Sequence, residues 1–340
     1  MAYHFKNLVF EGGGVKGIAY LGVQEILEEK DILSRIARIG GTSAGAINAV
    51  LLGLNFSPAE AKEILWKLDF NNFLDSDWGV IRDFKRFRDE YGWYKGNYFR
   101  NWIGKLIKQK TGNSEATFAD IEKLKDKSGF RSLYLVGTNL STGFSEVFSA
   151  EHTPRMCVAD AARISMSLPF FFAAIRSLRG DVYVDGGVTD NYPIKLFDRE
   201  KYLDTENFLM PDYYKKTNRS LNKNERPVSK YVYNKESLGF RLDSSVEIDL
   251  FRDHAEPPRR TIDDLFSYML ALGMSIYKLQ DNYHLHSDDW QRTVYIDTLG
   301  VGTADFSLSE AKKQALYDSG KKGSEAYFKW YDNEEPKANK

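Results

Sequence analysis

Residues 39–47 read IGGTSAGAI and frame a serine as Gly41-x-Ser43-x-Gly45. Apolar residues precede this serine, and a run of small residues at helical spacing follows it. Small flanking residues allow a sharp turn from strand to helix, which is how many hydrolases expose a nucleophilic serine above the end of a sheet. The stretch therefore predicts a strand–turn–helix unit with Ser43 as a candidate nucleophile.

A second glycine-rich turn comes earlier in the chain. An apolar strand is expected over 8–10, and the segment 12–17, GGGVKG, then opens a helix expected over 18–29. Glycines let backbone N–H groups approach an anion closely, and a helix N-terminus favours negative charge. The segment also fits the dinucleotide fingerprint, which requires an acidic residue at the end of the second strand. The expected second strand, 36–39, runs into glycines instead, so nucleotide binding is the weaker interpretation.

A third expected strand delivers an acidic side chain to a Gly-Gly turn. Residues 182–184 are largely apolar, and Asp185 follows them. A serine hydroxyl needs a neighbouring base, and a carboxylate at a strand end can supply one. A Ser-His-Asp triad is the alternative, because His284 and His286 follow Ser43 and Asp185 in chain order. Both histidines lie at the polar end of an expected helix beside acidic residues, which is not a catalytic setting.

The other expected elements continue the alternation of strands and helices. Helices are expected over 44–54, 58–68, 98–108 and 153–167, the last with Thr153 as N-cap and Pro154 at its first position. Strands are expected over 132–139, 144–148 and 293–296. This succession predicts a three-layer α/β/α fold with a mainly parallel sheet flanked by helices.

The composition changes after Asp198. Residues 199–230 are polar without a sustained period and predict a surface insertion, and helices are expected over 261–283 and 309–331. The helix over 261–283 is apolar nearly all round, which is typical of a core or subunit-interface helix. We therefore expect a catalytic domain at 7–198, with an insertion and a mostly helical C-terminal extension at 199–340 that pack on the same fold.

Charge and cysteine usage exclude several classes of protein. The 47 Lys and Arg residues nearly balance the 48 Asp and Glu residues, so nothing argues for a nucleic-acid partner. A single cysteine, Cys157, cannot form an internal disulfide. The five histidines show no metal-ligand spacing, so neither a metal nor another cofactor is expected. Because no apolar run has the length of a signal peptide or membrane span, we expect a cytoplasmic protein, or one exported by a signal-peptide-independent secretion system.

The three strand ends together resemble the patatin-like phospholipase family. The family's oxyanion motif, serine elbow and Asp-Gly-(Gly/Ala) motif correspond to residues 12–17, 41–45 and 185–187. Segments 138–143, 165–169 and 190–193 are also similar to the family, so the resemblance covers roughly 7–198. It is strongest to the bacterial branch that includes secreted phospholipase toxins. Glu11 departs from the pattern, because the family often has Asp or a small residue there, and we expect an effect on loop packing.

The resemblance implies a Ser–Asp dyad without histidine. Ser43 would be the nucleophile and Asp185 the general base. The oxyanion hole would be formed by the turn that contains Gly12, Gly13, Gly14 and Lys16, with backbone N–H groups binding the oxyanion and the lysine positioning the loop. The implied activity is that of a lipid acyl hydrolase of the phospholipase A or lysophospholipase type, which cleaves a carboxylic ester through an acyl-enzyme.

The resemblance leaves other interpretations open. One is a catalytically silent lipid-binding or scaffold protein with the same fold. The toxin-like branch also implies a host protein activator besides a phospholipid or lysophospholipid substrate, and the sequence leaves the oligomeric state open.

One window of the sequence combines aromatic and cationic side chains. Trp66, Trp78, Trp93 and Trp102 fall in it, and arginines and lysines are interleaved at 82–88. This mixture suits a peripheral membrane surface, where amphipathic rings and basic side chains both find partners. The alternative is a cap whose aromatic side chains pack inward over the active site.

Overall fold

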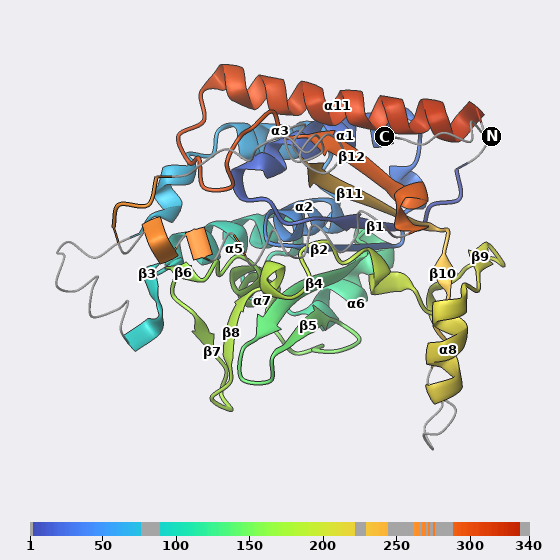
Figure 1. The fold of residues 1–340 in the computed structure, drawn as a ribbon, viewed down its shortest axis with the longest axis horizontal. Coiled ribbons are helices and arrows are strands. Elements are labelled where there is room, and N and C mark those ends of the chain that lie inside the picture. Colours follow the sequence, from blue (N-terminus) through green and yellow to red (C-terminus); the bar gives the residue numbers. More distant parts are fainter. Residues whose placement is uncertain are drawn as a thin grey trace.

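The computed structural model describes residues 3–75, 89–221, 229–243, 261–264, 267–269, 271, 272, 275 and 288–333. Within these residues the chain forms a mainly parallel sheet flanked by helices (Figure 1). The predicted fold class is therefore confirmed. Among the described helices, none is long and apolar enough to cross a bilayer.

Within the described part of the chain, the central sheet has eight strands. Their bounds are β1 Asn7–Phe10, β2 Arg38–Thr42, β4 Ser132–Asn139, β5 Phe144–Ser149, β7 Ile175–Arg176, β8 Val182–Asp185, β11 Ser237–Asp243 and β12 Thr293–Asp297. The strand order is β12-β11-β1-β2-β4-β8-β7, and β5 also pairs with β4. The pairs along β12-β11-β1-β2-β4 are all parallel. The pairs β4–β5, β4–β8 and β8–β7 are antiparallel. Because β11 and β12 belong to this sheet, the sheet crosses the expected boundary at 198.

Helices pack against the sheet and against one another. Their bounds are α1 Ala19–Glu29, α2 Ala44–Gly53, α3 Pro58–Trp66, α5 Asn97–Thr111, α6 Phe118–Ser128, α7 Val158–Ser165, α8 Asp212–Leu221 and α11 Glu310–Asn333. The long helix α11 lies beside α1 and β12, which brings the C-terminal region back to the start of the chain (Figure 1). Two separate two-stranded pairs complete the described strands: β3 (Gly92–Tyr94) with β6 (Phe170–Phe172), and β9 (Phe208–Leu209) with β10 (Tyr233–Asn234).

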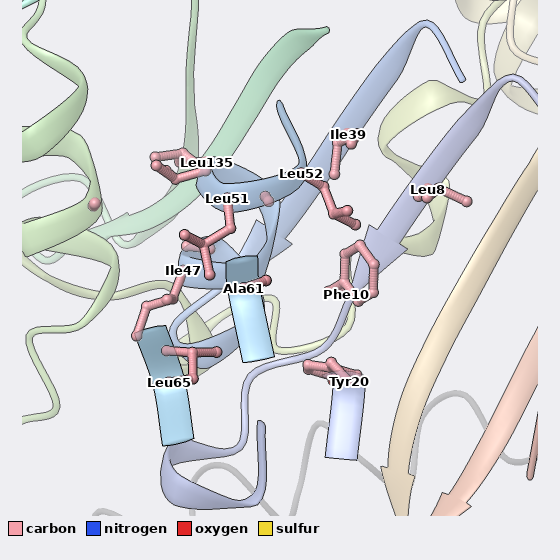
Figure 2. Close-up of a cluster of buried hydrophobic side chains, with 14 of the residues drawn as sticks. Leu8, Phe10, Tyr20, Ile39, Ile47, Leu51, Leu52, Ala61, Leu65 and Leu135 are labelled. Carbon is pink, nitrogen blue, oxygen red and sulfur yellow. The ribbon is translucent and has the colours of Figure 1, made fainter. Parts of the chain in front are cut away.

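Alternation along the strands divides the core between the two faces of the sheet. Leu8 and Phe10 of β1 belong to a large cluster that includes the apolar residues of α1 and α2. Figure 2 shows side chains of β1, β2 and β4 packed against α2 and α3. Val9, between them in β1, instead joins a smaller cluster with Tyr134 and the segment 192–202. Every residue of α2 is buried, so the helix that follows Ser43 is held rigidly inside the molecule.

The helix expected over 153–167 begins five residues later, at Val158, so its predicted start is wrong. The carbonyl oxygens of Pro154 and Met156 accept the N–H groups of Ala119 and Phe118 at the start of α6. These carbonyls therefore stabilise the neighbouring helix in place of their own. The expected N-cap residue, Thr153, instead bonds back to Ser149.

The expectation for 199–230 is also incomplete. The segment contains the short strand β9 and the helix α8, whose Tyr214 is buried. Strand β11 was not expected, although the helix over 309–331 and the strand over 293–296 are confirmed as α11 and β12. Most of the helix expected over 261–283 lies outside the described residues.

The aromatic window is only partly described. Trp66, Trp93 and Trp102 are half-buried. Trp102 packs against Phe73 and Phe99, with ring centroids 5.7 and 5.9 Å away. Trp78 and residues 82–88 lie outside the described residues. The described tryptophans thus pack at least partly inward.

Candidate active site

Ser43 lies between β2 and α2, in a backbone conformation that residues other than glycine rarely adopt. Its φ is 53° and its ψ is −122°. Such strain persists only where the surroundings enforce it, and it is frequent at functional sites. The flanking glycines allow the turn: a Cβ on Gly41 would overlap the backbone of Gly45, and a Cβ on Gly45 would overlap the carbonyl oxygen of Phe10. The Gly-x-Ser-x-Gly pattern is therefore a packing requirement at both glycines.

Ser165 and Met166, at the end of α7, contact Ser43. The Ser43 N–H donates to Ser165 Oγ at 3.0 Å, and that hydroxyl donates to the carbonyl oxygen of Val136 at 2.6 Å. Ser165 thus connects the serine turn to β4. The Ser43 hydroxyl donates to Met166 Sδ at 3.6 Å, and Ser43 is 7% exposed. A thioether is a weak acceptor, so this contact holds the hydroxyl only loosely.

The strand registers bring Asp185 to the serine turn. Thr42, at the end of β2, pairs with Val136 of β4. Asp185, at the end of β8, pairs with Gly137, the next residue of β4. Strand β5 pairs along one edge of β4, so β2 and β8 both pair along the opposite edge. Because β2 is parallel and β8 antiparallel to β4, these two strands run toward each other. Their carboxyl ends therefore meet, and Asp185 lies beside the residue that precedes Ser43.

Asp185 is fully buried and held by neighbouring backbone groups. Its Oδ1 accepts the N–H of Gly187 at 2.8 Å. Its own N–H donates to the carbonyl oxygen of Ser167 at 2.9 Å, and its carbonyl oxygen accepts the hydroxyl of Thr138 at 2.9 Å. The carboxylate is thus fixed in position, which suits a group that must receive a proton from one direction.

The glycine-rich turn after β1 lies against the serine. A Cβ on Gly12 would stand 3.0 Å from Ser43 Cβ. The Gly12 N–H donates to the carbonyl oxygen of Asn191 at 3.0 Å, so this amide is already engaged. Among the described residues, none accepts a hydrogen bond from the N–H of Gly13 or Gly14. Gly14 has a φ of 58°, and a Cβ there would overlap Thr303, so the turn requires glycine at this position.

Residues from the C-terminal region hold this turn in place. The N–H of Val15 donates to the carbonyl oxygen of Thr303 at 3.2 Å, and Leu242 occupies the space where a Cβ of Gly13 would stand. Lys16 is half-buried, and its N–H donates to the carbonyl oxygen of Gly13 at 3.3 Å. The lysine therefore belongs to the turn that it was expected to position.

Glu11, where the sequence departs from the family pattern, is a buried anchor between β1 and β11. Its carboxylate accepts the N–H of Leu242 at 2.6 Å, and Oε1 lies 3.9 Å from Nε of the buried Arg241. Arg241 in turn contacts Asp243 at 3.1 Å. The departure thus concerns how the glycine-rich turn is anchored.

Burial raises the pKa of Asp190, which lies between Asp185 and Asn191 in sequence, to about 7, although Lys195 acts in the opposite direction. Its backbone accepts the Thr42 hydroxyl at 3.0 Å. Asp190 thus contacts the serine turn through its backbone.

The histidines that could form a triad are not described. His284 and His286 lie outside the described residues. His152 contacts the hydroxyl of Ser149 at 2.8 Å, and His4 is exposed.

Sequence reasoning singled out the segment that contains Ser165 and Met166 but assigned it no role, and it missed the other residues that support the site: Arg241, Leu242 and Thr303. For the β11 residues a signal existed, because Leu238, Phe240 and Leu242 alternate with other residues.

A mainly parallel sheet flanked by helices, with a serine in a strained strand-to-helix turn, places the protein among α/β proteins with a nucleophile-elbow turn. More specifically, the chain belongs to the patatin-like phospholipase family, because the sequence profile of that family, described as Patatin-like phospholipase, matches residues 8–198.

Individual relatives support this assignment. YqhO of Bacillus subtilis is 29% identical over 335 residues, which cover 94% of this chain and 97% of YqhO. Protein 463L of Invertebrate iridescent virus 6, named a probable lipid hydrolase, is 26% identical over 57% of this chain and 63% of its own. The structure of VipD from Legionella pneumophila has a similar fold, with a TM-score of 0.59 at 16% identity over 96% of this chain and 67% of VipD. The family of this chain thus includes lipid hydrolases.

Proposed function

We propose that the protein is a lipid acyl hydrolase of the phospholipase A or lysophospholipase type, with Ser43 as nucleophile and Asp185 as general base. The observation that carries the proposal is the pairing of β2 and β8 with consecutive residues of β4, which joins their carboxyl ends. The strained turn at Ser43 and the family membership support it.

The reaction follows from the groups around Ser43. After rotating away from Met166, the hydroxyl gives its proton to the Asp185 carboxylate while Oγ attacks the ester carbonyl carbon. The alcohol leaves with the proton from Asp185, and an acyl-enzyme remains on Ser43. Water then gives a proton to Asp185 and attacks the acyl carbon. The fatty acid is released, and the proton returns to Ser43 Oγ.

The oxyanion of each tetrahedral intermediate needs hydrogen-bond donors fixed in advance. We assign this role to the N–H groups of Gly13 and Gly14. Gly12 contributes close approach to Ser43 because its own N–H is held by Asn191. Lys16 positions the turn through its backbone hydrogen bond to Gly13.

A hydrolysis assay on a panel of phospholipids, lysophospholipids and short soluble esters tests the proposal. Ser43→Ala and Asp185→Asn should each lower the rate by at least about a thousandfold, and a fluorophosphonate should label only proteins that retain Ser43. His284→Ala and His286→Ala serve as matched controls that should retain near-normal rates. Full activity of Ser43→Ala would overturn the proposal, and loss of activity in a histidine variant would favour the triad.

Partners and location are part of the same proposal. We expect the protein to act at a lipid surface as a peripheral protein, either in the cytoplasm or after export. The assay therefore includes an arm with host cell extract, because the family resemblance implies a protein activator. A protein that stays inactive on the whole panel with extract, yet binds lipid, would be the silent lipid-binding alternative.

A further inference from the structure

Two hairpin turns carry the most exposed large apolar side chains near the candidate site. We call them the hairpin tips: residues 140–144, which link β4 to β5 and include the first residue of β5, and residues 177–181, between β7 and β8. Leu178 is fully exposed, Phe144 is 72% exposed and Leu140 is 50% exposed. Large apolar side chains that cluster on an exposed projection are typical of a surface that binds a membrane or another protein.

The hairpin tips are joined to each other. The N–H of Leu140 donates to the carbonyl oxygen of Val182 at 2.8 Å, and the N–H of Val182 donates to Ser141 Oγ at 3.0 Å. These bonds continue the pairing of β4 with β8 beyond Asn139. Figure 1 shows the two hairpins projecting together at the lower edge of the molecule, away from α11. They therefore present one surface.

That surface lies on the same edge of the sheet as the candidate site. Strand β4 pairs with Asp185 at Gly137 and reaches Leu140 three residues further on. At roughly 3.3 Å per residue, Leu140 stands about 10 Å beyond the backbone of Asp185 in the direction in which β2 and β4 run. A flat surface that contacts the hairpin tips would therefore face the carboxyl ends of the parallel strands, where Ser43 lies.

Cationic groups flank the apolar side chains. Arg176 and Arg179 are exposed, and Arg176 donates to the hydroxyl of Tyr91 at 2.9 Å. Of the nearby carboxylates, Glu146 accepts hydrogen bonds from Tyr183 and Asn139, and Asp181 is half-buried. Asp89 and Glu90 are exposed near Arg176, whereas on the tip itself, residues 177–181, the exposed charge is that of Arg179.

We propose that the hairpin tips dock the protein on a lipid bilayer that contains anionic phospholipids, an inference that rests on the proposed lipid hydrolase function. Leu140, Phe144 and Leu178 would enter the boundary between headgroups and acyl chains, and the two arginines would contact lipid phosphates. The docked protein would present the edge with Ser43 to the ester bonds of the bilayer.

Vesicle co-sedimentation tests this proposal in a Ser43→Ala background, in which no lipid is consumed. Phe144→Ser with Leu178→Ser should lower the partition coefficient onto vesicles of phosphatidylcholine and phosphatidylglycerol by about tenfold or more. Arg176→Gln with Arg179→Gln should lower it on these vesicles but leave it unchanged on pure phosphatidylcholine. The matched controls are Leu209→Ser, an exposed leucine on the distant β9, and Lys216→Gln with Arg219→Gln on α8, which should bind normally.

Activity measurements separate this proposal from the function that it rests on. With Ser43 intact, the Phe144 and Leu178 variant should hydrolyse vesicles at least about tenfold more slowly and a short soluble ester at a rate within about twofold of the unmodified protein. Unchanged vesicle binding by this variant, or equal losses in the Leu209 control, would overturn the docking surface. Absence of hydrolysis on every substrate would overturn the proposed function alone, because binding in the Ser43→Ala background is measured independently.

Discussion

At the scale of single residues, the site depends on groups whose ordinary preferences are overridden. Ser43 adopts a positive φ, and Asp185 is a fully buried carboxylate. Each state is unfavourable in isolation, and each is stabilised by neighbours: Ser165 holds the serine turn, and Gly187 and Thr138 hold the aspartate. The folding free energy of the sheet and of α2 thus maintains a strained arrangement at its edge.

Asp190 allows a test of this argument through pH. Its folded-state pKa of about 7 lies above its ordinary value near 4, so folding favours the protonated acid. The free energy of unfolding should therefore lose a contribution as the pH rises from about 4 through about 7. Asp190→Asn should remove this loss, so that the variant gains stability relative to the unmodified protein across that interval.

Urea unfolding at several pH values between 4 and 8 measures this effect. Asp318→Asn, at an exposed position on α11, is the control that should follow the unmodified protein. Parallel pH profiles for Asp190→Asn and the unmodified protein would contradict the assignment of a raised pKa to Asp190.

At the scale of elements, the same substitution should have opposite effects in two helices. Gly45 lies in the first turn of α2, where a Cβ would overlap the carbonyl oxygen of Phe10, so Gly45→Ala should lower the free energy of unfolding by about 1–3 kcal/mol. Gly104 lies inside α5, where a Cβ would meet only ordinary contacts at 3.6 Å and beyond. Gly104→Ala should raise the free energy of unfolding by about 0.5–1 kcal/mol.

Denaturant titrations of both variants measure these changes, and each variant is the control for the other. Soluble-ester hydrolysis should fall only in Gly45→Ala, because only this glycine supports the serine turn. Equal stability of the two variants would show that the close packing of α2 on β1 is not what requires glycine at position 45.

The elements also show what the sequence could predict. The turns at Ser43, Gly12–Gly14 and Asp185 were predictable because glycine-rich turns after apolar strands leave a local pattern. The start of α7 was not, because carbonyl groups of 154 and 156 are used by α6, which follows from tertiary contacts. Likewise, Thr42 and Asp185 pair with consecutive residues of β4 because β2 and β8 are both neighbours of β4. This strand order cannot be predicted from a local sequence pattern.

At the scale of the whole molecule, the family-matching region and the C-terminal region contribute strands to the same sheet. Strand β1 lies between β2 and β11, and Phe10 stacks on Phe240 with ring centroids 4.9 Å apart. Leu242 and Thr303 hold the glycine-rich turn from the C-terminal side. A catalytic domain that ended at 198 would leave an edge of β1 unpaired, which favours aggregation.

A buried ion network joins the same two regions and supplies the last prediction. Arg292 contacts both carboxylate oxygens of Asp198, at 2.5 and 2.8 Å, and Asp289 at 2.6 Å. Tyr214 donates to Asp198 at 2.5 Å, and all four side chains are buried. Because Arg292→Met would leave the buried Asp198 carboxylate without its cation, while Asp289 keeps Lys195 at 3.7 Å, the free energy of unfolding should fall by about 3–5 kcal/mol.

Urea titration measures this loss, with Arg35→Met as the control. Arg35 pairs with Asp31 at 3.4 Å on the surface, where removal of an ion pair should cost about 1 kcal/mol or less. The double variant Arg292→Met with Asp198→Asn should recover part of the stability, because it removes the Asp198 carboxylate that Arg292→Met leaves without its cation. If Arg292→Met cost no more than Arg35→Met, the ion network would contribute little to joining the two regions. If instead the loss is large and unfolding remains a single transition, the residues that bear the candidate site and those that hold its glycine-rich turn unfold together.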